Sequence, residues 1–386
     1  MSTQQKPFVQ TLKSMANKLC NLLALAIGAG SLSASAQTVS MSALSSFGGG
    51  DGWLSPGEGG YTYLGTANNE RGLAYGDGDL FLVSRTGGNN IRILNPTTGA
   101  DLGGFNMTGV SGGTFAISTA AVGGDGTVYA ANLTTSATTP FTVYAWTPGN
   151  FSTAPTVAYS GNPLGGGTRL GDDLAVTGSG ASTLLAAGSG AGSSGYEIIH
   201  PTTSTATAIS FTGSPPNSGD FRLGLTFVNS SQVLGSQGSS LYRNSSFSGS
   251  TGTLLGSPAI PDPAGATADR LLSTTLLDGL TLLAVQSVGD SHVSVYNISD
   301  PNNPVWLASG DNTTSPAANG NGTGELAWGA TTDNSDGSVS ETLYAMSTNQ
   351  GIQAFTVTVA PVPEPTTLSL LALGLGGVVW RKKPHR

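Results

Sequence analysis

Arginines and acids stand close together at several places in this chain, and they are the residues best suited to polar chemistry. Seven arginines lie between residues 37 and 362, and four of them have an acid within three residues. The clusters are Glu70 with Arg71, Arg169 with Asp172 and Asp173, Asp220 with Arg222, and Asp269 with Arg270. A guanidinium group can hold a carboxylate through two parallel hydrogen bonds, and it can equally hold an acidic or hydroxyl-rich ligand. Paired carboxylates could instead perform acid–base hydrolysis of a glycan, although sequence spacing does not give their separation.

Other catalytic and metal-binding patterns are sparse. His200 and His292 each stand among alternating apolar residues, which favours a packed or surface role over that of a base or a ligand. The sequence has no zinc-binding His-Glu-x-x-His pattern and no phosphate loop. Residues 333–341 are rich in acids, but their first, third and fifth residues are Asp, Ser and Gly, which does not fit an EF-hand. We therefore expect no catalytic residue, metal or cofactor, and we interpret residues 333–341 as a solvated hairpin.

The N-terminal end has the features of a signal peptide. Lys6, Lys13 and Lys18 precede or flank the start of an apolar segment at 19–32, and the small residues 34–36 fit a cleavage site. We expect a signal helix within residues 1–36 and a mature start near Gln37. The only cysteine of the chain falls in this leader, so the mature protein has no disulfide or thiol nucleophile.

The C-terminal end, residues 361–386, has three parts. They are a polar motif at Pro363, Glu364 and Pro365, an apolar segment at 366–380, and a basic stop at 381–386 that begins with Arg381, Lys382 and Lys383. As a helix the apolar segment would rise about 22 Å, which is short for a hydrocarbon core of about 30 Å. The basic residues would keep its end in the cytoplasm, so the preceding chain would lie across the membrane.

This tail resembles the PEP-CTERM sorting signal of Gram-negative bacteria. The resemblance implies that the chain is exported across the inner membrane and that an exosortase recognises the tail and removes it. It also implies association with exopolysaccharide production. An ordinary single-span membrane anchor is the alternative.

Charge in the mature chain is strongly acidic. All five lysines lie in the two ends, and residues 37–362 hold seven arginines against twenty-one acids, a balance of −14 compared with −8 for the whole chain. Such a surface repels nucleic acid and anionic membrane faces. It suits a soluble protein outside the cell.

A repeat of roughly 45 to 55 residues organises the sequence between the two ends. Each unit has an apolar strand, a turn, a strong strand pair and a weaker fourth strand, and the six units begin near 71, 114, 174, 222, 270 and 325. Asp-Gly pairs at 77–78, 125–126 and 278–279 predict type I′ hairpins between the first and second strands. Tandem four-stranded units that cannot bury both faces alone are typical of a β-propeller.

The repeat therefore predicts an all-β protein, with a β-propeller over residues 61–360 and a linker over 37–60. Six blades is the count, and seven would follow if Gly/Ser-rich stretches hold further strands. We expect an orphan strand at 61–67 to complete the last blade and close the ring. Residues 296–307 resemble the LVIVD-type repeat of bacterial surface propellers. A pair of β-sandwiches and a right-handed β-helix are the alternatives.

If the chain folds as a propeller, the four arginine clusters lie close together in space. The first strand of each blade lines the channel, so the four clusters would surround one channel mouth. They could fasten neighbouring blades together, or they could bind a sugar chain. Tyr75, Trp146 and Trp328 could stack on sugar rings or pack between blades.

Together these features predict an exported cell-envelope or extracellular-matrix protein with a non-catalytic binding or scaffold role. Its expected partners are the exosortase, exopolysaccharide and other matrix proteins, and it would touch the membrane through the C-terminal segment before processing. The rival hypothesis is an extracellular polysaccharide hydrolase or lyase that uses the channel mouth.

Overall fold

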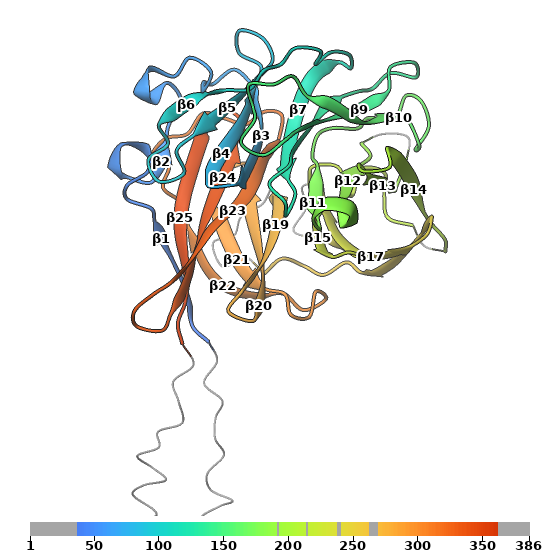
Figure 1. The fold of residues 1–386 in the computed structure, drawn as a ribbon. Coiled ribbons are helices and arrows are strands. Elements are labelled where there is room, and N and C mark those ends of the chain that lie inside the picture. Colours follow the sequence, from blue (N-terminus) through green and yellow to red (C-terminus); the bar gives the residue numbers. More distant parts are fainter. Residues whose placement is uncertain (1–36, 191–192, 214, 238–240, 262–268, 362–386) are drawn as a thin grey trace, which may run out of the picture. The chain divides into compact units, whose positions relative to one another are not determined.

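The structure, a computed structural model, describes residues 37–190, 193–213, 215–237, 241–261 and 269–361. Internal contacts define a compact body, Val39–Ala360, which is described here (Figure 1). The expected signal helix, sorting motif, membrane segment and basic stop lie outside the described residues. Within the described residues, no helix is both long and apolar enough to cross a membrane.

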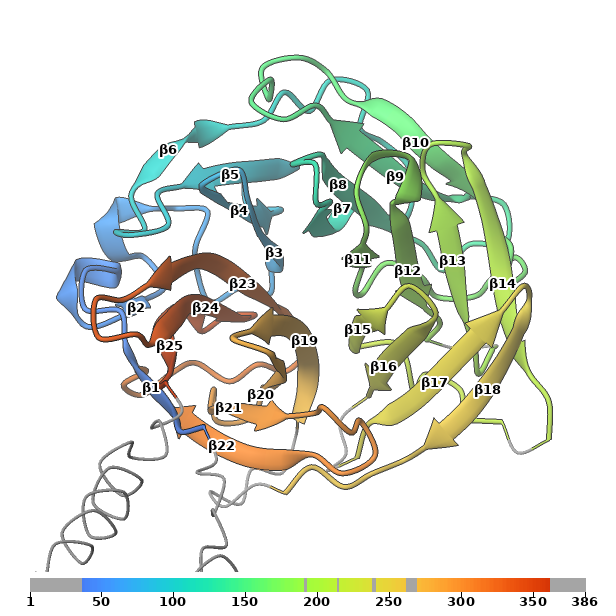
Figure 2. The same cartoon turned by 60° about the horizontal axis from the view of Figure 1, so that its bottom comes forward.

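The body is all-β, as the sequence predicted, and it consists of antiparallel meanders arranged in a ring (Figure 2). One sheet contains β3 (Glu70–Gly76), β4 (Asp79–Ser84), β5 (Asn90–Leu94) and β6 (Asp101–Gly104). The next contains β7 (Phe115–Val122), β8 (Val128–Leu133), β9 (Phe141–Trp146) and β10 (Thr156–Gly161). A third contains β19 (Asp269–Leu277), β20 (Leu280–Ser287), β21 (Val293–Asn297) and β22 (Val305–Gly310).

An eight-stranded sheet separates the second and third of these. Its first half is the meander β11 (Ala175–Thr177), β12 (Leu184–Gly188), β13 (Tyr196–His200) and β14 (Thr205–Phe211). Its second half is β15 (Gly224–Asn229), β16 (Gln232–Ser236), β17 (Arg243–Ser248) and β18 (Thr251–Gly256). The halves join where β14 and β18 pair in parallel, through Ser210 with Thr251 and Phe211 with Gly252.

The last sheet contains both ends of the body. Its strands are β23 (Gly324–Asp333), β24 (Val339–Ser347), β25 (Gly351–Val359) and β1 (Val39–Ala43), and the short β2 (Trp53–Leu54) also pairs with β25. Short 3-10 turns lie at η1 (Gly48–Gly50), η2 (Glu58–Gly60) and η3 (Gly180–Ser182).

Closure of the ring differs from the prediction. β1 pairs along its full length with β25, from Val39 opposite Val359 to Ala43 opposite Phe355, so the closing strand comes from the segment expected to be a linker. The prediction that 61–67 closes the ring was wrong. That segment forms turns, in which Tyr61 and Tyr63 stack at 5.3 Å and the Tyr61 hydroxyl accepts a hydrogen bond from the Asp101 amide. Its aromatic alternation is that of a strand, but β1 already occupies the available edge.

Packing between neighbouring meanders explains why the middle strands are almost continuously apolar. Six clusters of buried side chains each join two adjacent meanders, so a central strand is covered on both faces. Leu80, Phe81, Leu82 and Val83 of β4 are all fully buried. Phe81 packs toward Phe105 and Phe151, while Leu82 lies in the cluster shared with Tyr344 of β24.

The hairpins confirm two of the three predicted turns. Asp77 and Gly78 both have positive φ, as do Asp278 and Gly279, and each pair joins strands whose flanking residues are directly opposite. Asp125 and Gly126 instead belong to a longer loop between Val122 and Val128. The Asp125 carboxylate accepts the Thr127 amide there, which stabilises a wider turn.

The innermost strands are β3, β7, β11, β15, β19 and β23, and each contacts the next around the ring, with β23 contacting β3. Residues from all six line a central channel space of about 220 Å³. The first residues of these strands therefore gather at one mouth, which positions the candidate site.

Pairing of β1 with β25 should contribute measurably to stability. Val39 is 7% exposed and lies in the apolar cluster with Val357 and Val359, whereas Ser40 is exposed. Val39→Asp would bury an unpaired carboxylate and should lower the free energy of unfolding by about 2–4 kcal/mol. Ser40→Asp, the matched control, should change it by less than about 0.5 kcal/mol. Denaturant unfolding of the exported protein measures both, and equal losses would contradict this role of β1.

Candidate functional site

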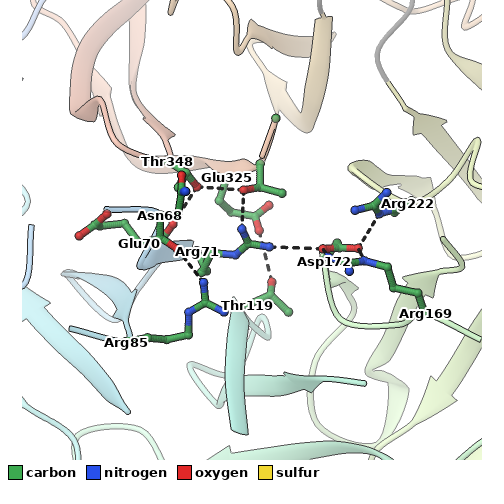
Figure 3. A network of polar contacts seen from close by, with 12 residues as sticks. Asn68, Glu70, Arg71, Arg85, Thr119, Arg169, Asp172, Arg222, Glu325 and Thr348 are labelled. Atoms are coloured by element: carbon green, nitrogen blue, oxygen red, sulfur yellow. Dashed lines mark hydrogen bonds and ion pairs between the residues drawn. The ribbon is translucent and has the colours of Figure 1, made fainter. Parts of the chain in front are cut away.

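One buried carboxylate, Asp172, organises the channel mouth. It precedes β11 and is 3% exposed. Its Oδ1 accepts from Arg169 Nη2 at 2.6 Å and Arg71 Nη2 at 3.3 Å, and its Oδ2 accepts from Arg169 Nε and Arg222 Nε, both at 2.6 Å. These arginines come from the starts of β3 and β15 and from the loop before β11, so one carboxylate joins three meanders (Figure 3).

Arg71 also joins the mouth to the last sheet. It is 3% exposed, and its Nη1 donates to the Thr323 hydroxyl at 2.8 Å. Thr323 hydrogen bonds with Thr348, whose hydroxyl donates to the Glu70 carbonyl at 2.7 Å. This series of hydrogen bonds runs from β3 to the start of β23, on to the end of β24 and back to β3, so it fixes the Arg71 side chain in place.

Several positively charged guanidinium groups lie close together at the mouth, and this closeness affects their pKa values. Burial lowers the pKa of Arg71 to about 10, against the favourable charge of Asp172, and the guanidinium groups of Arg85, Arg169 and Arg222 lower it further. Burial also lowers the pKa of Arg85. For Asp172, burial alone would raise the pKa, but hydrogen bonds and charge from Arg169 and Arg222 outweigh it and hold the pKa below its usual value.

A pocket of about 400 Å³ opens beside this network. Its lining includes Arg71, Arg85, Arg169 and Arg222, together with asparagines, Thr323 and the ring of Phe115. Among the described lining residues there is no acid. We call this space the arginine pocket.

Arg85 follows β4 and was missed in the sequence because no first strand begins there. Its guanidinium carbon lies 3.6 Å from the centre of the Phe115 ring, and its Nη2 donates to the Asn68 carbonyl at 2.7 Å. The Nε and Nη1 atoms of Arg85 are buried, and neither has a hydrogen-bond partner in the described part of the chain.

The other predicted mouth residues divide by the direction of their side chains. The pairing of β3 with β4 shifts register between Glu70 and Gly72, and the side chains of Glu70 and Arg71 have different partners. Glu70 Oε1 instead accepts the Gly65 amide at 2.9 Å, and burial raises the pKa of this carboxyl. Asp220 pairs with Arg243 at 2.6 Å rather than with Arg222.

The fourth predicted cluster is Asp269 with Arg270, and the structure describes only part of it. The Arg270 side chain is half-buried, and burial followed by the charge of Arg222 lowers its pKa. Asp269 begins β19, but its side chain lies outside the part of the molecule that the structure describes.

A second polar feature lies deeper in the channel, where Asp173 and Glu325 form a carboxyl pair. Asp173 Oδ2 accepts the Leu225 amide at 2.6 Å, and Glu325 Oε2 accepts from the Thr119 hydroxyl at 3.3 Å. Burial raises the pKa of both carboxyls, and the charge of Asp173 raises that of Glu325 further. The two carboxyls influence each other's protonation through their charges, and Asp173 Oδ1 is buried without a hydrogen-bond partner in the described residues. Glu325 gave no sequence signal beyond its place at the start of a predicted first strand.

The remaining candidates lie away from the pocket. His200 is exposed at the end of β13, and neither it nor His292 lines the channel or the arginine pocket. Trp146 is 1% exposed and packs between meanders, whereas Tyr75 stacks on Tyr344 at 6.0 Å and also lines the channel. Trp328 donates to the Ser273 carbonyl and partly lines the channel.

No group of three or more potential metal ligands occurs in the portion of the chain covered by the structure. The acidic loop 333–341 forms the hairpin between β23 and β24, where the Asp336 carboxylate accepts from the Ser338 amide and hydroxyl. Asp336 Oδ1 is thus used within the turn, whereas the Glu341 carboxylate accepts from the Thr275 hydroxyl of β19.

Comparison with known families identifies the C-terminal segment. Residues 361–383 match the PEP-CTERM protein-sorting motif, so the chain carries this motif, as its sequence indicated. The motif implies export to the cell envelope or outer surface with an exosortase as the processing partner. A comparison with curated proteins gives no match.

Solved structures resemble the body. A DUF4623 family protein from Bacteroides eggerthii is 17% identical, with a TM-score of 0.57 over 76% of this chain and 71% of its own. The allergen Mala s 1 from Malassezia sympodialis is 11% identical, with a TM-score of 0.49 over 77% of this chain and 94% of its own. At such identities the first likeness supports the propeller-like fold and nothing about activity.

The carboxyl pair should make stability depend on pH. In the folded protein the pKa values of both carboxyls are raised above their unfolded values, which lie near 4. Above about pH 4 the folded state therefore binds more protons than the unfolded state. Stability consequently falls as the pH rises through the folded pKa values. Glu325→Gln keeps an acceptor for Thr119 but removes one titrating group. Its loss of Tm between pH 5 and 8 should therefore be smaller than that of the wild type by at least about 2 °C.

Thermal unfolding of the exported protein at the two pH values gives this comparison. Asp333→Asn, at an exposed position, is the control and should follow the wild-type pH dependence. A Glu325→Gln curve parallel to that of the wild type would contradict a raised pKa of Glu325 in the folded protein.

Proposed function

We propose that this protein is an exported, exosortase-processed propeller that binds matrix components without catalysing a reaction. The proposal counts six blades, with each half of the eight-stranded sheet as one blade and the five-stranded sheet as the last. The proposed location is the envelope or extracellular matrix of a Gram-negative bacterium, and the proposed ligand is exopolysaccharide. Membrane contact is confined to the C-terminal segment before processing.

The observation that carries this proposal is the arginine pocket. Its four lining arginines come from three parts of the chain that are far apart in sequence, and Asp172 and Thr323 hold Arg71 in a fixed position. A rigid polar pocket at the end of a channel is suited to holding a hydroxyl-rich chain by hydrogen bonds. The surrounding propeller supplies the scaffold, because its sheets are packed against one another on both faces.

The Arg–carboxylate contacts also support the scaffold role. They form a hub at Asp172 rather than separate pairs around a ring. The hub connects the β11 blade with the adjacent β15 blade and with the non-adjacent β3 blade. Fastening the blades and binding a ligand are therefore compatible roles of the same arginines.

A polysaccharide hydrolase or lyase is the second candidate, and the carboxyl pair is the observation that favours it. Glycosidases place their two carboxyl groups about 5–9.5 Å apart, so that a sugar or water fits between them. Asp173 is instead 3% exposed and accepts the Leu225 amide, and Glu325 is 8% exposed and accepts from the Thr119 hydroxyl. This arrangement favours a structural role for the pair.

Co-sedimentation with the exopolysaccharide of the source organism tests the proposal, with released sugar measured in the same tube. The processed protein should be retained without sugar release. Arg222→Gln should reduce retention severalfold, because it removes a pocket cation while Asp172 keeps two arginine partners. Arg92→Gln, which removes an arginine paired with Asp101 outside the pocket, should leave retention unchanged.

The other outcomes separate the alternatives. Sugar release that Asp173→Asn abolishes without loss of fold would establish the enzyme instead. Absence of retention would contradict exopolysaccharide binding and would leave a scaffold whose partners are matrix proteins.

A further inference from the structure

The arginine pocket has a charge that sets it apart from the rest of the body. Four guanidinium groups line it, and Asp172, which contacts three of them, is the carboxylate that balances them directly. Apart from these five residues, residues 37–362 carry twenty acids and only three arginines. A concave cationic site within an acidic body concentrates anions at one place and repels them elsewhere.

Arg85 is prepared for a ligand but is not neutralised by a contact. Its guanidinium group is held by the Phe115 ring and the Asn68 carbonyl, while its buried Nε and Nη1 find no hydrogen-bond partner in the described residues. A buried donor without a partner costs about 1–3 kcal/mol. Both atoms are covered from solvent, so a ligand oxygen in the pocket recovers that cost when the Arg85 guanidinium group turns toward it. The planar fork of a guanidinium group matches the two oxygens of a carboxylate.

The remaining lining suits a sugar ring. Phe115 is 41% exposed and offers an apolar surface beside Arg85. Asn68, Asn69 and Asn321 supply amide groups that can hydrogen bond with hydroxyls. The volume of about 400 Å³ lies within the range of about 300–1,000 Å³ that is common for small-molecule sites.

We propose that the arginine pocket binds a carboxylate-bearing sugar residue, at the end or on a branch of an acidic polysaccharide. The carboxylate would lie against Arg85 and the neighbouring guanidinium groups, with the apolar face of the sugar toward Phe115. The acidic outer surface repels the remaining polymer, so attachment is confined to the mouth. This inference rests on the proposed binding function and specifies its ligand class.

Isothermal titration of the processed protein with trigalacturonate tests the inference, with galactotriose as the neutral ligand of matched size. Trigalacturonate should bind at least tenfold more tightly than galactotriose, and its affinity should fall as salt rises. Arg85→Gln should weaken trigalacturonate binding at least tenfold, and Arg85→Lys, which keeps the charge but loses the fork, should lie between. Equal affinity for the charged and neutral sugars would overturn the inference.

Matched controls separate the pocket from general electrostatics. Arg92→Gln makes the same change outside the pocket and should alter the affinity for trigalacturonate by less than twofold. Phe115→Leu should weaken binding while leaving every lining charge in place, and it gives a second test if Arg85→Gln fails to fold. Equal weakening by Arg92→Gln and Arg85→Gln would contradict a specific site.

Two further measurements distinguish this inference from the proposed function. Inorganic sulfate at the concentration of trigalacturonate should fail to displace it, and full displacement would overturn the sugar specificity in favour of a general oxyanion site. If Arg85→Gln co-sediments with exopolysaccharide as well as the wild type does, the acidic-sugar site is wrong while matrix binding stands. If the wild type does not co-sediment but still binds trigalacturonate, the proposed matrix ligand is wrong while the site stands.

Discussion

The contact on which the channel mouth depends is the one between Asp172 and three guanidinium groups. A carboxylate buried to this degree is costly unless it is fully hydrogen bonded, and here Arg169, Arg222 and Arg71 supply donors to both of its oxygens. The same contact draws three cations into a space that they would otherwise avoid. Arg85 then adds a fourth, so the mouth is stable and still cationic.

The ring arrangement of the innermost strands brings these arginines together. The six innermost strands contact one another in sequence order, with β23 returning to β3, so residues at the starts of distant repeats meet at one mouth. Pairing of β1 with β25 closes the ring and sets the relative positions of the first and last blades. The link from Arg71 through Thr323 and Thr348 crosses the same junction, and it therefore couples closure to the position of a pocket residue.

Much of the fold could be predicted from the sequence, because apolar strand runs and Asp-Gly turns are local signals. The closing strand could not, since β1 is short and rich in serine, whereas the aromatic segment at 61–67 has the stronger strand pattern. The gathering of Arg71, Arg169 and Arg222 followed from their places before first strands. The partners of these arginines could not be predicted, because they depend on the direction of each side chain. Asp172 contacts the arginines, whereas the neighbouring Asp173 interacts with Glu325. Arg85 reaches the pocket from the end of a second strand.

The stability of Asp172→Asn tests the central role of this carboxylate most directly. Removing its charge leaves three guanidinium groups uncompensated, and the free energy of unfolding of the exported protein should fall by about 3–5 kcal/mol. Asp101→Asn, which breaks the more exposed pair with Arg92, is the matched control and should cost about 0–1 kcal/mol. A loss for Asp172→Asn no larger than that for Asp101→Asn would contradict the account.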